Sequence, residues 1–241
     1  MNKQPCHGPA PFKLLKPAAI VIVIWVVLVG CGGEPLSDEP APQTRRKAPP
    51  VRGTIVAMGD SLTAGFGVDE TEAYPALLQK KLSADGQHFK VVNAGISGET
   101  SSGALSRIDW VTSALKPDLI ILETGGNDGL RGIAPAVLRT NLDRIVSIIK
   151  SNGVAVILCG MQMLSNLGPE FTQAFAGIYP EIAQKHAIPL IPFFLEGVAG
   201  DPQYNQTDRL HPTAEGYRRV VDHIYPHVLA VVENLPAKSP P

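Results

Sequence analysis

The chain has 241 residues, of which 44% are hydrophobic and 18% are charged, a composition typical of one globular domain with some irregular chain. Its 21 Lys and Arg residues nearly balance 22 Asp and Glu residues, so the net charge of −1 provides no field that would gather phosphates. The one basic run is Arg45-Arg46-Lys47. We therefore expect no nucleic-acid partner.

Residues 1–30 have the pattern of a cleaved signal peptide. Three lysines precede an unbroken apolar run, Ala18–Val29, which is followed by Gly30 and Cys31. As a helix, this run would span about 18 Å at ~1.5 Å per residue, which is too short for a hydrocarbon core of about 30 Å. The pattern therefore favours a cleaved signal over a membrane-spanning segment.

The end of this segment, Leu28-Val29-Gly30-Cys31, resembles the lipobox of bacterial lipoproteins, in which the cysteine becomes the lipidated first residue of the mature chain. We expect lipidation of Cys31 to hold the protein on the periplasmic face of a membrane in the bacterial envelope. Gly32 is similar to the residue found at that place in lipoproteins sent to the outer membrane. Two alternatives stay open: an uncleaved anchor, and an ordinary signal peptide in which Cys31 is incidental.

Residues 31–50 are expected to form a Pro-rich tether. Prolines recur between Gly32 and Pro50 among charges of both signs, with almost no apolar residues. An extended polyproline-like chain of this length reaches about 60 Å at ~3.1 Å per residue, enough to hold a domain clear of a bilayer. At the other end of the chain, residues 236–241 are predicted to be a disordered tail. Residues 51–235 are left as the folded domain.

From residue 51 onward, short β-rich runs alternate with stretches of helical periodicity. The expected strands are residues 54–58, 89–93, 119–122, 154–158 and 189–191. The expected helices lie around residues 74–82, 101–115, 138–149 and 217–232, with a short helix before His186. Each connection between strands is long enough for a right-handed crossover, so the pattern predicts an α/β fold: a parallel sheet in a three-layer α/β/α sandwich.

The three cysteines, Cys6, Cys31 and Cys159, stand in such different contexts that we expect no disulfide framework. Cys159 ends an apolar run with strand character, so it is expected to be a small core residue and not a nucleophile. No group of Cys and His residues has the spacing of zinc ligands. The residues therefore predict no metal site.

Polar and glycine-rich segments follow the first three predicted strands. They are Gly59-Asp60-Ser61-Leu62, residues 93–98 and Gly125-Gly126-Asn127-Asp128, and a fourth segment, Asp208-Arg209-Leu210-His211-Pro212, precedes the last helix. In open parallel sheets, ligands bind beyond the carboxyl ends of the strands. We therefore expect these segments to meet at one site.

The residue types in these segments suit acyl transfer. A serine hydroxyl such as that of Ser61 is a poor nucleophile until a base takes its proton, and a histidine serves as that base when an acid orients it. Asp208 and His211 supply such a pair three residues apart. Donors to a developing oxyanion could be the backbone N–H of Ser61, the backbone N–H of Gly98 and the amide of Asn127.

Together, the four segments resemble the four sequence blocks of the SGNH, or GDSL, hydrolase family. Residues 91–98 and 125–132 resemble, within that family, the bacterial thioesterase I, arylesterase and lysophospholipase group. The resemblance implies a flavodoxin-like, five-stranded parallel sheet, no metal and no cofactor. Lipases of the α/β-hydrolase fold place the serine in G-x-S-x-G, and no such motif is centred on Ser61.

The resemblance also implies roles for individual residues. Ser61 would be the nucleophile, with Asp208 and His211 completing a catalytic triad. Ser61, Gly98 and Asn127 would form the oxyanion hole, and Gly95 is an alternative to Gly98. Residues 161–171, which are apolar and acidic, are expected to border the acyl pocket.

We therefore expect a serine esterase that hydrolyses carboxylic esters, acyl thioesters or both through an acyl-Ser61 intermediate. Its expected partners are small acyl esters or thioesters, with lysophospholipid as an attractive membrane substrate, and the expected state is a monomer. Two alternative functions stay open: an O-acetyl esterase acting on envelope carbohydrate, and a noncatalytic envelope lipoprotein that binds a ligand. The complete set of candidate catalytic residues speaks against the noncatalytic alternative.

Overall fold

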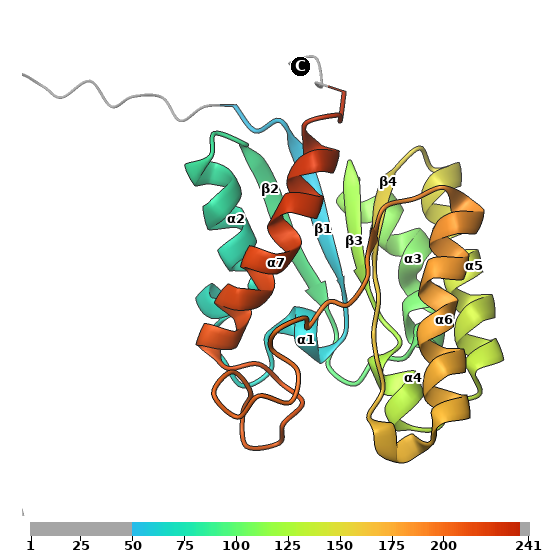
Figure 1. The fold of residues 1–241 in the computed structure, drawn as a ribbon. Helices are drawn as coiled ribbons and strands as arrows, with labels where there is room; N and C mark the ends of the chain where they lie inside the picture. Colours follow the sequence, from blue (N-terminus) through green and yellow to red (C-terminus); the bar gives the residue numbers. More distant parts are fainter. Residues whose placement is uncertain (1–49, 237–241) are drawn as a thin grey trace, which may run out of the picture. The chain divides into compact units, whose positions relative to one another are not determined.

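The computed structural model describes residues 50–236, drawn in colour in Figure 1. The predicted signal peptide, Cys31, all of the tether before residue 50 and residues 237–241 lie outside the described residues. The strands are β1 (Gly53–Gly59), β2 (Phe89–Gly95), β3 (Leu119–Glu123), β4 (Ala155–Cys159) and β5 (Leu190–Ile191). The helices are α1 (Ser61–Ala64), α2 (Tyr74–Ala84), α3 (Ser101–Leu115), α4 (Gly126–Leu130), α5 (Pro135–Ser151), α6 (Pro169–His186) and α7 (Ala214–Val232), with the short 3₁₀ helices η1 (Glu70–Glu72) and η2 (Ser165–Leu167).

All five strands are parallel and lie in the order β2-β1-β3-β4-β5. In β1, Ile55 pairs with Val91 of β2 on one side and with Leu119 of β3 on the other. Helices α2 and α7 cover one face of the sheet, and α3, α5 and α6 cover the other (Figure 1). The predicted three-layer α/β/α sandwich is therefore confirmed.

The hydrophobic core is complete within the described residues. One continuous cluster of buried apolar side chains runs from Ile55 in β1 to Val232 at the end of α7. In α5, the buried residues Leu138, Leu142 and Ile145 recur at spacings of four and three, the stripe expected of a helix packed on a sheet. Residues 50–236 thus have the core of an independent domain.

The prediction of a short helix before His186 is wrong, because the helix there is long. α6 has 18 residues and continues through Pro180, although proline removes one helical hydrogen bond. Phe175, Ile178 and Ile182 form a buried stripe on this helix. Packing of that stripe on the sheet outweighs the local break at Pro180.

Cys159 is fully buried at the end of β4, as expected for a core residue. Burial raises the pKa of its thiol well above the usual value. Because the thiolate is the reactive form of cysteine, this thiol is inert.

The carboxyl ends of the strands share one edge of the sheet, because the strands are parallel. β1 ends at Gly59, β2 at Gly95 and β3 at Glu123, and α1 and α4 lie at this edge (Figure 1). The described chain begins at the opposite edge, where β1 starts at Gly53 (Figure 1). Within residues 50–236, no helix is both long and apolar enough to span a bilayer.

Candidate active site

Ser61 is the first residue of α1 and follows β1 after a single intervening residue, Asp60. The Asp60 carboxylate caps this helix, since its Oδ1 accepts a hydrogen bond of 3.0 Å from the backbone N–H of Leu62. The helix has four residues and ends at Gly65, whose φ of 82° lies in the left-handed region. Ser61 is therefore held on a tight strand-to-helix turn, where it is half-buried and lines a cavity.

Ser61, His211 and Asp208 lie in one line of hydrogen bonds. His211 Nε2 is 2.9 Å from Ser61 Oγ, and His211 Nδ1 is 2.6 Å from Asp208 Oδ2. A proton on Nδ1, facing the Asp208 carboxylate, leaves Nε2 free to accept the serine proton. The structure thus brings together Ser61 and His211, which lie 150 positions apart in the sequence.

Asp208 is ionised in this arrangement. Desolvation opposes ionisation, but hydrogen bonds from the backbone N–H and ring of His211, and from the N–H of Leu210, lower the pKa of Asp208 to about 2. The two backbone donors lie 3.0 Å and 2.9 Å from Oδ1. One oxygen of the carboxylate therefore holds the loop, and the other is left for the imidazole.

Two contacts that the sequence did not predict hold the histidine loop. The ring of Phe66 lies against that of His211, with centroids 4.6 Å apart. Gln206 donates its backbone N–H to the carbonyl of His211 over 2.8 Å, and its side-chain Nε2 to the carbonyls of Phe66 and Pro212 over 2.7 Å and 2.9 Å. A single side chain therefore joins the segments that carry Phe66 and His211.

Gly98 and Asn127 line the same cavity as Ser61, whereas Gly95 does not. A Cβ at Gly95 would collide with the backbone of Ala64 in α1, so that glycine is needed for close packing. Gly98 has a φ of 80°, and its carbonyl accepts a hydrogen bond of 2.7 Å from the Arg131 guanidinium. The Asn127 amide donates one hydrogen bond to Asp60 Oδ2 over 3.0 Å.

A buried pair of carboxyl groups, Asp60 and Glu123, lies at the serine turn, and no sequence pattern predicts it. Glu123, at the end of β3, is fully buried, and its Oε2 accepts from Thr63 Oγ1 over 2.8 Å and from the Asp60 N–H over 3.3 Å. Burial is the main cause that raises the pKa of both carboxyls, and the charge of Asp60 adds to the effect on Glu123. Glu123, whose pKa is raised well above its usual value, is the protonated member of the pair.

Further polar contacts fix the loops around Gly98 and Asn127. Arg107 of α3 makes a bidentate ion pair with Glu99, in which Nε lies 2.7 Å from Oε1 and Nη2 lies 2.6 Å from Oε2. Its Nη2 also donates to the carbonyl of Gly59 over 3.4 Å. Asp128 of α4 accepts from the backbone N–H and hydroxyl of Ser101. These contacts tie the second and third segments to α3 and to the end of β1.

The cavity beside Ser61 has a volume of about 360 Å³ and a mainly apolar lining. Residues 161–164, from the stretch expected to border an acyl pocket, are part of that lining. The other apolar lining residues are Leu62, Phe66, Leu130, Phe193, Leu195, Ala199 and Leu210. Such a cavity suits an apolar chain attached to a group that reacts at Ser61. Nowhere in residues 50–236 do three or more His, Cys, Asp or Glu side chains form a cluster that could hold a metal ion.

Comparison with known proteins identifies relatives across most of this domain. The GDSL-like Lipase/Acylhydrolase family matches residues 57–219, which include every site residue named above. Esterase TesA of Pseudomonas aeruginosa is 41% identical over 173 residues, which make up 72% of this chain and 86% of that protein. Thioesterase 1/protease 1/lysophospholipase L1 of Escherichia coli K12 is 36% identical over 169 residues, 70% of this chain and 80% of that protein. The crystal structure of the psychrotrophic esterase EstA from Pseudoalteromonas sp., inhibited by monoethylphosphonate, matches with a TM-score of 0.72 and 32% identity over 76% of this chain and 100% of that chain.

Proposed function

The chain belongs to the GDSL-like lipase/acylhydrolase family and is a serine ester hydrolase, and on that premise we propose that Ser61, His211 and Asp208 are its catalytic triad. The observation that carries the proposal is the pair of hydrogen bonds on the His211 ring, 2.9 Å to Ser61 Oγ and 2.6 Å to Asp208 Oδ2. An imidazole between a hydroxyl and an ionised carboxylate is the arrangement that activates a serine nucleophile.

The reaction proceeds in two steps. As Ser61 Oγ attacks the ester or thioester carbonyl, His211 Nε2 takes its proton, and the Asp208 carboxylate stabilises the resulting imidazolium. His211 then passes this proton to the leaving alkoxide or thiolate, which leaves the acyl group on Ser61. In the second step, His211 takes a proton from water, the hydroxide adds to the acyl carbonyl, and the acid is released with return of the proton to Ser61.

We propose that the oxyanion formed in both steps is held by the backbone N–H groups of Ser61 and Gly98 and by the side chain of Asn127. The hydrogen bond to Asp60 occupies one N–H of the Asn127 amide, and the second N–H is available to the oxyanion. The Arg131 guanidinium orients Gly98 through its carbonyl. Loss of a single oxyanion donor commonly costs about 3–4 kcal/mol of transition-state stabilisation.

The substrates we propose are esters and thioesters of apolar acyl chains. The apolar lining of the cavity supports this class, and so do the relatives, which bear the names esterase, thioesterase and lysophospholipase. Lysophospholipid is the member of the class that a membrane-attached enzyme would meet at high local concentration.

The test is hydrolysis of p-nitrophenyl acetate, butyrate, octanoate and palmitate by the chain and by its Ser61→Ala variant. We expect the variant to lose about 10⁴-fold or more in kcat, because the nucleophile is absent. Equal activity of the two proteins would refute the role of Ser61. A preference for medium chains over acetate supports acyl substrates, whereas a preference for acetate, with release of acetate from acetylated polysaccharide, would favour an envelope O-acetyl esterase.

We further propose that the enzyme is a monomeric lipoprotein on the periplasmic face of an envelope membrane, with the outer membrane favoured by Gly32. The lipobox-like residues Leu28–Cys31 support cleavage after residue 30 and lipidation of Cys31. A Cys31→Ser variant should lose incorporation of labelled fatty acid and pass from the membrane fraction to the soluble fraction. Retention of the label in that variant would refute lipidation at this residue. Sedimentation of the purified protein checks the monomer.

A further inference from the structure

Exposed large apolar side chains gather around the mouth of the cavity. Eight such side chains occur in residues 50–236, and five of them, between 38% and 53% exposed, lie at the carboxyl edge of the sheet: Phe66, Ile96, Leu130, Leu164 and Leu167. Single exposed apolar residues are ordinary on a protein surface, but a group around one opening marks an interaction site. We call these five residues the apolar rim.

The rim is continuous with the cavity. Phe66, Leu130 and Leu164 line the cavity and are also exposed. Ile96 precedes the lining residue Ser97, and Leu167 is joined to Leu164 by a backbone hydrogen bond of 3.2 Å. An acyl chain that reached the rim could therefore enter the cavity along apolar side chains.

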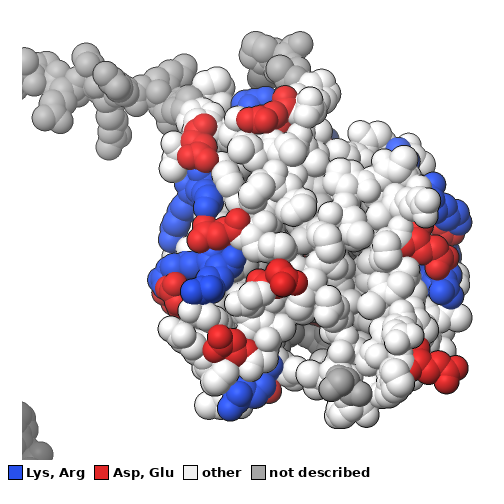
Figure 2. Space-filling view, in the orientation of Figure 1, with Lys and Arg blue, Asp and Glu red and all other residues white. Residues whose placement is uncertain are grey.

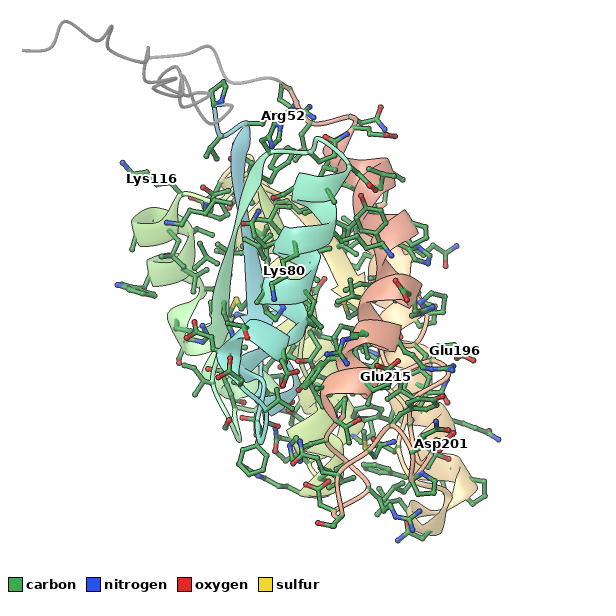
Figure 3. The ribbon with its side chains drawn as sticks, turned by 90° about the vertical axis from the view of Figure 1, so that its left-hand side faces the viewer. Arg52, Lys80, Lys116, Glu196, Asp201 and Glu215 are labelled. Carbon is green, nitrogen blue, oxygen red and sulfur yellow. The ribbon has the colours of Figure 1, made fainter. Side chains whose placement is uncertain are left out.

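Most charged side chains lie away from this region. In Figure 2, charges gather along the two sides of the molecule, and the hollow at its lower end is bordered mostly by uncharged atoms. In Figure 3, Lys80 on α2 and Lys116 at the end of α3 lie away from the lower end of the molecule, whereas Asp201 lies nearer to it. Of the acidic residues near the cavity, Asp60 lines it and is buried, and Asp208 is hydrogen-bonded to His211.

Two arginines border the rim. Arg131 follows Leu130, and Arg209 lines the cavity with a φ of 62°, in the left-handed region that favours glycine. Among the described residues, neither arginine has an ion-pair partner. An apolar patch edged by unpaired guanidinium groups complements a lipid surface, whose acyl interior lies beneath phosphate head groups.

We propose that the apolar rim docks on the surface of a lipid bilayer or micelle, so that acyl lipids pass from the lipid phase into the cavity. This inference deepens the proposed function and rests on it for the identity of the cavity as the ester site. The docking surface itself is independent of the chemistry at Ser61, and it can be tested in a protein that has no activity.

The place where the remaining chain joins the domain allows the rim to reach a lipid surface. The domain is joined at Gly53, at the edge of the sheet opposite the rim (Figure 1). A domain of this size is about 40 Å across. The residues from Gly32 to Pro50 can extend to about 60 Å at ~3.1 Å per residue, so a domain anchored at Cys31 could turn its rim toward the same membrane.

The experiment measures vesicle binding by residues 51–241, which lack the anchor. This part of the chain contains the complete core and covers the full length of a solved relative. All proteins carry Ser61→Ala, so that no lipid is hydrolysed, and the vesicles contain phosphatidylcholine with a minor fraction of phosphatidylglycerol. The rim variant is Ile96→Ser/Leu167→Ser, because neither side chain lines the cavity. The matched control is Trp110→Ser/Val51→Ser, which removes exposed apolar groups from α3 and from the start of the described chain, at the edge of the sheet opposite the rim.

We expect the partition coefficient of the rim variant to fall about tenfold and that of the control to stay unchanged. With Ser61 restored, both variants should keep the parent kcat/KM for p-nitrophenyl butyrate. Failure of the parent to bind vesicles, or equal binding by rim variant and control, would overturn the proposal. Sedimentation that shows a dimer in the parent and a monomer in the rim variant would also overturn it, since a second copy would then occupy the rim. Neither the binding nor the sedimentation results depend on whether Ser61 is the nucleophile.

Discussion

At the scale of single residues, the Asp208 carboxylate divides its two oxygens between the His211 ring and the backbone of its own loop. Because these donors hold its pKa near 2, below the value of about 3.9 for an unperturbed aspartate, folding is favoured by the ionised form. This contribution to stability is fully present above pH 4 and is lost as the pH falls toward 2. Mild acid therefore does not neutralise the group that orients His211.

Asp208→Asn should lower kcat for p-nitrophenyl butyrate by about 10³–10⁴-fold with little change in KM. The amide keeps the shape of the side chain but no longer favours a proton on His211 Nδ1, so Nε2 is a poorer base. Steady-state kinetics at pH 7 measure the effect. Asp201→Asn is a suitable control, since the Asp201 carboxylate caps an exposed turn by accepting a hydrogen bond from the N–H of Gln203. A loss smaller than tenfold in Asp208→Asn would contradict the role of the carboxylate.

At the scale of the elements, Glu123 connects β3 to the turn that carries the nucleophile. It accepts hydrogen bonds from Asp60 and Thr63, on either side of Ser61, and a Cβ at Gly59 would collide with its carboxyl group. The serine turn can therefore approach β3 closely because residue 59 is glycine and because Glu123 offers an acceptor. We regard Glu123 as a residue that positions the turn and not as one that contacts substrate.

Glu123→Gln should change how stability depends on pH. Because the folded-state pKa of Glu123 is raised, its contribution to stability is fully present below the unfolded value of about 4.3 and is lost as the pH rises toward the folded-state pKa. Glutamine does not titrate, so the free energy of unfolding of the wild type should fall relative to that of Glu123→Gln above pH 4.3, by at most about 1.4 kcal/mol per pH unit.

Urea denaturation between pH 4 and pH 8 makes this comparison. Glu123→Ala serves as the contrasting variant: it leaves the Asp60 N–H and the Thr63 hydroxyl without an acceptor and creates a cavity, so it should be destabilised at every pH by about 2–4 kcal/mol. Parallel curves for the wild type and Glu123→Gln would show that Glu123 holds no extra proton in the folded state.

The strands and the segments around Ser61, Gly98, Asn127 and His211 could be predicted from sequence because their signals are local: apolar runs, glycines at strand ends and an Asp-x-x-His spacing. The fold and the family follow from them. Glu123 could not be predicted in this way. An acidic residue at the end of a strand is ordinarily solvent-facing, and its burial depends on the serine turn some 60 positions earlier in the chain.

The length of α6 and the contact of Phe66 with His211 also depend on residues that are distant in the sequence. Pro180 is a local break in the helix, and it is overridden by the packing of Phe175 and Ile178 against the rest of the core. The Phe66 ring meets His211 only because the two loops converge at the carboxyl edge of the sheet. Sequence patterns find the groups that carry the chemistry, and tertiary packing decides what supports them.

At the scale of the whole molecule, the domain and its proposed anchor have separable tasks. Within residues 50–236, one continuous buried core runs from Ile55 to Val232. Residues 51–241 should therefore match the lipidated full chain within about twofold in kcat/KM for p-nitrophenyl butyrate, a substrate dissolved in water. The proposed attachment would instead raise the effective concentration of the domain at the membrane surface, and so speed its encounter with membrane-borne substrate.

The lipidated full chain should hydrolyse vesicle-borne lysophospholipid at least about tenfold faster than residues 51–241, because the proposed tether would confine the domain to the surface.

The length of the tether provides a second prediction, on the orientation of the rim. Deleting residues 36–45 leaves nine of the residues between Gly32 and Pro50, with a reach of about 28 Å at ~3.1 Å per residue, shorter than a domain about 40 Å across. The rim could then no longer turn toward the membrane that we propose holds Cys31. The shortened chain should keep full activity on p-nitrophenyl butyrate and lose the advantage on vesicles, whereas equal vesicle rates for the full and shortened chains would show that the rim does not need to face its own membrane.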